Sequence, residues 1–146
     1  LYLCGNARSK YADKIRTLIA KHNLEKRVFL PGEISEAEKN WMFENCKAFV
    51  FPSLSEGFGL PVVEAMHFGK PVVLSKLTSL PEIGGKEAVY LDNFLPEEIA
   101  SKIQFAIQNH TPEQQKSLKK RASFFSWQKA AEQYLEMYQA ILRKTN

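Results

Sequence analysis

The sequence lacks several features that define large classes of proteins. Its two cysteines, Cys4 and Cys46, are far apart and show neither the paired spacing of zinc sites nor that of redox motifs. We therefore expect free thiols in a reducing compartment, and a cytoplasmic location. No apolar run approaches the roughly 20 residues that span a bilayer, which argues against a transmembrane helix. No signal peptide is visible, although the chain begins with Leu1 rather than Met.

Charge of one sign and metal-ligand side chains are also scarce. The net charge is only +4 and is scattered, so it does not predict nucleic-acid binding. Aspartate occurs only at Asp13 and Asp92, so a D-x-D metal clamp cannot form. None of the three histidines has a cysteine or a second histidine at ligand spacing. We expect no metal and no cofactor.

What is present is the composition of a folded domain, with 146 residues of which 45% are hydrophobic and 25% charged. Short apolar or β-branched runs alternate with segments of helical periodicity, a pattern typical of βαβ units. The predicted strands cover residues 1–4, 28–30, 48–51, 71–74 and 88–91. We predict one α/β domain over residues 1–146 with a Rossmann-like, doubly wound parallel sheet. In such a sheet, ligands bind beyond the carboxyl ends of the strands.

Capping residues and periodicity set the expected helices. They cover residues 9–22, then begin at Ser35, near Pro61, at Pro96, after Thr111 and after Ser126. The segments 35–38 and 111–114 match capping boxes. Apolar residues of the last helix step by three and four, so we expect an exposed apolar stripe there unless another molecule covers it. That stripe includes Trp127, Tyr134 and Tyr138.

The segment after the third predicted strand carries the strongest functional pattern. It reads P-S-L-S-E-G-F-G-L-P-V-V-E-A-M over residues 52–66. Gly57 and Gly59 precede a helix start, where backbone N–H groups and the positive end of the helix dipole favour an anion such as a phosphate. Glu56 is expected in the turn and Glu64 in the first helical turn, so the two carboxylates cannot share one role.

A carboxylate is a poor partner for a phosphate but a good acceptor for a vicinal diol. The pattern therefore suits a nucleotide-sugar, with Glu64 at the ribose and Glu56 at a sugar hydroxyl beyond the phosphates. A purely structural interpretation stays open beside this one. Glycines often serve only the turn, and the helix dipole alone favours a glutamate in a first turn.

Further motifs follow the same loop in a fixed order. After F-P-S and E-G-F-G-L-P within residues 51–61 come V-E-A-M at 63–66, G-K-P-V-V at 69–73 and L-P-E at 80–82. Together they resemble the C-terminal domain of a family 4 (group 1) retaining glycosyltransferase of GT-B fold. The similarity extends from V-F-L-P-G at 28–32 to F-S-W at 125–127. It implies transfer of a glycosyl group from a nucleotide-diphosphate sugar to an acceptor with retention of anomeric configuration.

The resemblance also implies a role for each matched position. Glu64 would bind the ribose hydroxyls, and Glu56 would face the donor sugar at the reacting centre. Pro31 and Gly32, in the loop after the second strand, would lie beside the base. The backbone that meets the sugar hydroxyls and the diphosphate would be that of Gly57, Phe58, Gly59 and Leu60. The reaction would need no metal, and the acceptor would be a glycan or a lipid-linked glycan.

The sequence departs from the family pattern at its beginning. A further strand and helix, with an arginine and a lysine for the diphosphate, normally open this domain, and an acceptor-binding N-terminal domain precedes it. Neither precedes Leu1. We expect the chain to be the donor-binding part of a longer enzyme and to be inactive alone.

Other interpretations stay open beside this one. The basic run from Lys116 to Arg121 is expected to be a solvated helix face, with contact to anionic lipids at the inner face of the membrane as the alternative. A non-catalytic nucleotide-binding module is a second possible function, but it would not need a carboxylate such as Glu56 at the sugar end. A nucleotide-sugar epimerase of the same fold is disfavoured by the F-G-L-P core.

Overall fold

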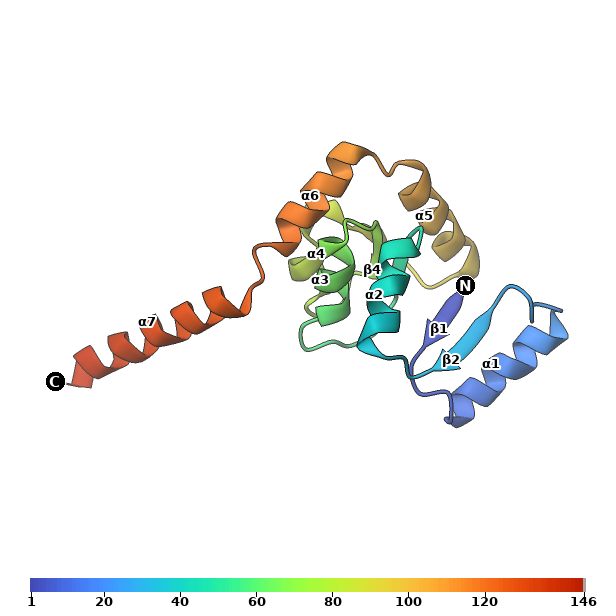
Figure 1. Ribbon diagram of the computed structural model, residues 1–146, viewed down its shortest axis with the longest axis horizontal. Helices are drawn as coiled ribbons and strands as arrows, with labels where there is room; N and C mark the ends of the chain where they lie inside the picture. The colour runs from blue at the N-terminus through green and yellow to red at the C-terminus, as the bar shows by residue number, and fades with distance from the viewer. Residues whose placement is uncertain (146) are drawn as a thin grey trace. The chain divides into compact units, whose positions relative to one another are not determined.

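The computed structural model describes residues 1–145 as alternating strands and helices (Figure 1). The sequence predicts one domain, and the described chain divides into two compact units, Leu1–Met42 and Phe43–Asn146. The division follows the strand pairing. The first two strands form one parallel sheet and the next three form another, whereas the sequence suggests one sheet of five.

The first unit contains strands β1 (Tyr2–Cys4) and β2 (Phe29–Gly32), which pair in parallel, and helix α1 (Lys10–Lys21) between them. Helix α1 begins where the sequence predicts, because the Ser9 Oγ accepts a hydrogen bond from the Ala12 N–H at 3.1 Å.

The prediction for Pro31 and Gly32 was wrong in one respect. Both residues end strand β2 instead of lying in the loop after it. The strand continues because Cys4 pairs with Gly32, and the Gly5 N–H donates to the Gly32 carbonyl at 2.9 Å.

The second unit is built on a sheet in the order β3 (Phe49–Phe51), β4 (Val72–Ser75) and β5 (Val89–Leu91), all parallel. Strand β4 is central and every one of its residues is buried. The helices of this part of the chain are α3 (Leu60–His67), α4 (Leu80–Gly84), α5 (Pro96–Gln108), α6 (Pro112–Ala122) and α7 (Trp127–Thr145), with a short 3₁₀ helix at Gly85–Glu87.

Helices cover both faces of this sheet, so the doubly wound arrangement is confirmed. Val72 and Leu74 of β4 point into a core with residues of α3, α4 and α6. Val73, between them, points into a second core with Ala106 of α5 and Leu91 of β5. The alternation is that expected for a parallel strand buried on both sides. Figure 1 shows β4 between α3 and α5.

The capping boxes have different outcomes. In α2 (Glu36–Asn45), the Glu38 carboxylate accepts from the Ser35 N–H at 2.8 Å and the Ser35 Oγ accepts from the Glu38 N–H at 3.3 Å, which confirms the box. In α6 the Thr111 Oγ1 accepts from the Gln114 N–H at 3.2 Å, but the Gln114 Oε1 is buried without a hydrogen-bond partner. The second box is therefore only half formed.

Helix α7 carries the predicted exposed apolar stripe. Trp127 is 82% exposed, and Tyr134 and Tyr138 are also exposed, with their rings 6.2 Å apart. None of the helices in residues 1–145 combines the length and the apolar character that a bilayer crossing requires.

The buried position of β4 predicts a large loss of stability on truncation. Leu74→Ala removes a side chain that is 0% exposed. We expect the free energy of unfolding to fall by about 2–5 kcal/mol, because a cavity remains in the core. Leu54→Ala is the matched control, since Leu54 is 68% exposed and should change stability by less than about 0.5 kcal/mol. Equal losses in urea denaturation of the two variants would contradict this assignment of the core.

Candidate functional site

The candidate site lies at the carboxyl edge of the three-stranded sheet. Because β3, β4 and β5 are parallel, the segments that follow them, residues 52–59, 76–79 and 92–95, all begin at the same edge. The predicted site residues from Glu56 to Glu64 belong to the first of these segments and to α3, which follows it. The structure therefore brings Glu56, Gly57, Phe58, Gly59, Leu60 and Glu64 into one strand–loop–helix unit.

The two glycines of the loop have different reasons to be glycine. Gly59 precedes α3 with a φ of 104°, and a Cβ there would lie 3.0 Å from the Leu80 Cδ2, so the fold itself requires a glycine. Gly57 has no such φ, and a Cβ there would meet nothing within 4 Å. The structural interpretation thus accounts for Gly59 but not for Gly57.

The N-terminus of α3 has no side-chain cap. Its N-cap residue is Gly59, and no side chain of the chain accepts from its first N–H groups. Helices that begin with Ser9 or Thr111 do have such a cap. The first turn of α3 therefore presents N–H groups and the positive end of its dipole at the carboxyl edge, as an anion-binding site requires.

Glu56 is half-buried and its atoms are held at several points. The Ser53 Oγ donates to the Glu56 Oε1 at 2.7 Å. The Glu56 N–H donates to the Thr78 Oγ1 at 3.1 Å, and the Ser79 Oγ donates to the Glu56 carbonyl at 3.2 Å. The carboxylate is thus fixed in place, with one oxygen engaged within the loop.

Hydroxyl groups after strand β4 are functional residues that the sequence reasoning missed. Ser75 ends β4, is 1% exposed, and donates from its Oγ to the Ser53 carbonyl at 2.5 Å. Thr78 and Ser79 follow it and bond to the backbone of Glu56. In the sequence these residues are 22 or more positions from their partners, and the only local signal is the S-K-L-T-S run before L-P-E.

Glu64 lies one residue farther into its helix than predicted. Helix α3 begins at Leu60 rather than at Pro61, so Glu64 falls in the second turn, and the first turn contains no acidic residue. The dipole effect decays within the first turn and therefore does not explain this glutamate. The side chain is half-buried, on the same helix whose N-terminus faces the carboxyl edge.

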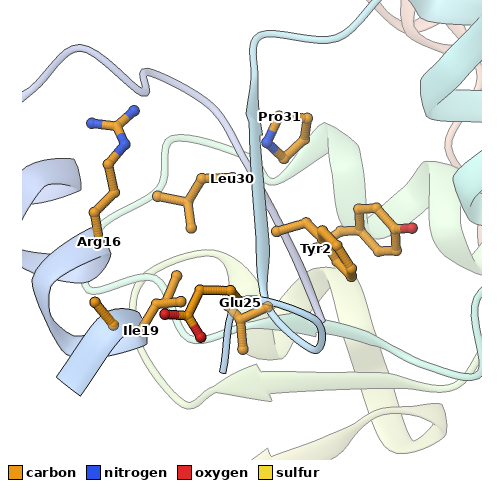
Figure 2. Close-up of a pocket in the computed structure, with 9 residues that line it drawn as sticks. Tyr2, Arg16, Ile19, Glu25, Leu30 and Pro31 are labelled. Carbon is orange, nitrogen blue, oxygen red and sulfur yellow. The ribbon is translucent and has the colours of Figure 1, made fainter. Parts of the chain in front are cut away.

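Pro31 and Gly32 belong to the first unit, whose own hollow has a volume of about 540 Å³. Figure 2 shows its labelled lining residues, with Pro31 and Leu30 of β2 on one side and Arg16 and Ile19 of α1 on the other. Its wall is mainly apolar. That Pro31 and Gly32 lie beside a base stays a prediction.

Asp92 joins two lysines at the carboxyl edge of the second unit. It follows β5 and forms ion pairs with Lys76, which follows β4, and with Lys102 of α5, whose Nζ lies 2.9 Å from the Asp92 Oδ2. Hydrogen bonds from Lys76 and then from Lys102 lower the pKa of Asp92 from its ordinary 3.8 to about 2. In residues 1–145, no group of three His, Cys, Asp or Glu side chains has the arrangement of a metal site.

The lowered pKa of Asp92 predicts an acid-sensitive contribution to stability. A carboxylate with a depressed pKa stabilises the fold fully above its unfolded pKa of about 3.9, and this contribution is lost as the pH falls towards about 2. We expect Asp92→Asn to flatten the dependence of the unfolding midpoint on pH between 4 and 2, modestly because the pair is exposed. Thermal unfolding at constant ionic strength measures this, with Asp13→Asn as a control for the loss of one carboxylate. A wild-type slope in Asp92→Asn would contradict the ion-pair assignment.

The fold and the site define a class: a Rossmann-like α/β fold of the type found in GT-B glycosyltransferases, as predicted. Residues 1–124 match the family described as Glycosyl transferases group 1, and the chain belongs to that family.

Its relatives include the O-antigen chain mannosyltransferase B of Escherichia coli, 29% identical over 131 residues that make up 88% of this chain and 34% of that protein. An uncharacterised glycosyltransferase of Methanocaldococcus jannaschii is 31% identical over 138 residues, 90% of this chain and 38% of that protein. The chain therefore spans little more than a third of the length of these relatives.

Similar solved structures include sucrose-phosphate synthase from Thermosynechococcus elongatus, with 25% identity and a TM-score of 0.84, over 99% of this chain and 39% of that one. Another is Anabaena HepE in complex with UDP, with 24% identity and a TM-score of 0.83, over 95% of this chain and 40% of that one.

Proposed function

We propose that the chain is the donor-binding part of an enzyme that transfers a sugar from a nucleotide-diphosphate donor to an acceptor with retention. The observation that carries this proposal is the loop at residues 53–59. It combines a fixed carboxylate at Glu56, a glycine at Gly57 that the fold does not require, and an uncapped helix N-terminus. Related proteins named as mannosyltransferases, and a similar structure that contains UDP, support the same chemistry.

The loop divides the donor among its parts. The N–H groups at the start of α3, with the backbone from Gly57 to Leu60, meet the diphosphate and the sugar hydroxyls. Glu64 accepts hydrogen bonds from the ribose diol, and Glu56 organises the donor sugar at the reacting centre. Pro31 and Gly32 lie beside the base.

The reaction proceeds by departure of the nucleotide from the same face on which the acceptor hydroxyl attacks. Charge on the leaving diphosphate is met by N–H groups and basic side chains, so no metal is required. The acceptor is a glycan or a lipid-linked glycan, bound by a part of the protein outside this chain. The protein works in the cytoplasm, and its acceptor brings it to the inner face of the membrane.

The two glutamates should separate in their effects. We expect Glu64→Gln in the whole protein to weaken bare nucleotide and nucleotide-sugar alike by about 1.5–3 kcal/mol, since a charged hydrogen bond to the ribose is lost. Glu56→Gln should leave nucleotide affinity nearly intact and lower kcat, because its interaction grows in the transition state. Calorimetry with UDP, GDP and ADP and their sugar conjugates, together with turnover, measures both.

A 2′-deoxyribose donor provides the control for this assignment. It should bind more weakly than the parent donor to the wild type but show little further loss in Glu64→Gln, because the partner has already been removed. If Glu56→Gln weakens bare nucleotide as much as Glu64→Gln does, the two-role assignment is wrong, and a binding module without catalysis becomes the better interpretation.

Gly57 and Gly59 offer a second, independent test of donor approach. Gly57→Ala should leave the unfolding midpoint unchanged, because a Cβ there has space, but it should weaken nucleotide-sugar binding at least tenfold, about 1.4 kcal/mol, if the backbone contacts the donor. Gly59→Ala should instead lower the midpoint, because its φ is 104° and Leu80 is close. Wild-type donor affinity in Gly57→Ala would place the donor away from this loop.

A further inference from the structure

Two hydroxyl residues after β4 hold the backbone of Glu56 from outside its own loop. The Thr78 Oγ1 accepts from the Glu56 N–H at 3.1 Å, and the Ser79 Oγ donates to the carbonyls of Glu56 at 3.2 Å and Phe58 at 2.8 Å. We propose that Thr78 and Ser79 are positioning residues that aim the Glu56 carboxylate at the donor sugar. This inference rests on the role proposed above for Glu56.

Thr78 holds its place at a cost to the backbone. Its φ is 51°, in the left-handed region that a β-branched residue rarely adopts and that glycine adopts freely. It lies in a turn that the Leu80 N–H closes onto the Leu77 carbonyl at 3.2 Å. The Thr78 side chain is exposed, so core packing does not explain its retention. Its hydrogen bond with the Glu56 N–H does.

Ser79 also gives up a local contribution to stability. It occupies the N-cap position of α4, where a serine hydroxyl ordinarily accepts from an N–H of the helix. Here the side chain makes no such bond, and its hydroxyl points to the loop that contains Glu56 and Phe58. Two adjacent residues therefore forgo the best local arrangement and bond to the same loop, which is typical of strain retained for function.

Ser53 completes the support at the carboxylate itself. Its Oγ donates to the Glu56 Oε1, while the Ser53 carbonyl is held by the buried Ser75 hydroxyl of β4. The main chain and one carboxylate oxygen of Glu56 are thus fixed from three sides. The second carboxylate oxygen is then directed by the scaffold, so a small rotation of the loop changes where it points.

The test exploits the backbone strain at Thr78. Thr78→Gly removes both the strain and the hydroxyl, so these effects oppose each other, and we expect an unfolding midpoint within about 3 °C of the wild type. In the whole protein kcat should fall roughly tenfold to a hundredfold, while bare-nucleotide affinity changes less than about threefold. Thr78→Ser keeps the hydroxyl and should retain kcat within about twofold.

Asn23→Gly is the matched control for relief of backbone strain. Asn23 is the other non-glycine residue with a left-handed φ in the described chain, at 54°, and it belongs to the first unit. It makes no hydrogen bond with the Glu56 loop, so its replacement should leave kcat unchanged. A fall in kcat confined to Thr78→Gly, and rescued in Thr78→Ser, supports the positioning role.

The outcomes separate this proposal from the proposed function. If the wild-type protein turns over donor and Thr78→Gly keeps wild-type kcat, the positioning role is overturned and the donor function stands. If Thr78→Gly lowers the midpoint by more than about 10 °C, Thr78 is a structural residue and the proposal also fails. If the wild-type protein neither binds nor consumes any UDP-, GDP- or ADP-sugar, the proposed function falls and this inference falls with it.

Discussion

The parallel pairing of β4 with β3 and β5 is the constraint on which the candidate site depends. Strand β4 is buried along its whole length and sends alternate side chains into two cores, so its register is strongly fixed. That register places the end of β4 beside the end of β3, with Leu74 paired to Phe51. The hydroxyls that follow β4 can therefore reach the loop that follows β3. The position of Glu56 is in this sense set by packing in the cores.

Much of this arrangement could be predicted because its signals are local. Ser9, Ser35 and Thr111 cap the helices that their sequence context indicated, and apolar runs marked all five strands. The start of α3 was misplaced by one residue, because Gly59 can act as N-cap only in the left-handed conformation that its neighbour Leu80 permits. That shift moved Glu64 out of the first turn and removed the helix dipole as its explanation.

The support of Glu56 could not be predicted, because it is entirely non-local. Thr78 and Ser79 are 22 and 23 positions from Glu56 and meet it only once β3 and β4 have paired. Sequence periodicity carries no information about such a contact. The glycines illustrate the same limit: both fit a turn equally well on paper, and only the space around each Cβ shows that the fold needs Gly59 and leaves Gly57 unexplained.

Local rules are obeyed in most of the molecule and broken together at the carboxyl edge. Helices α1, α2 and α6 have side-chain caps, whereas α3 begins on a glycine and α4 begins on a serine whose hydroxyl bonds elsewhere. The turn before α4 holds a threonine with a φ of 51°. A sequence selected for stability alone would place a capping side chain before α3, a capping hydroxyl on α4 and a glycine in that turn. Because all three departures converge on the segment from Glu56 to Gly59, they indicate that this segment is held for a purpose other than folding.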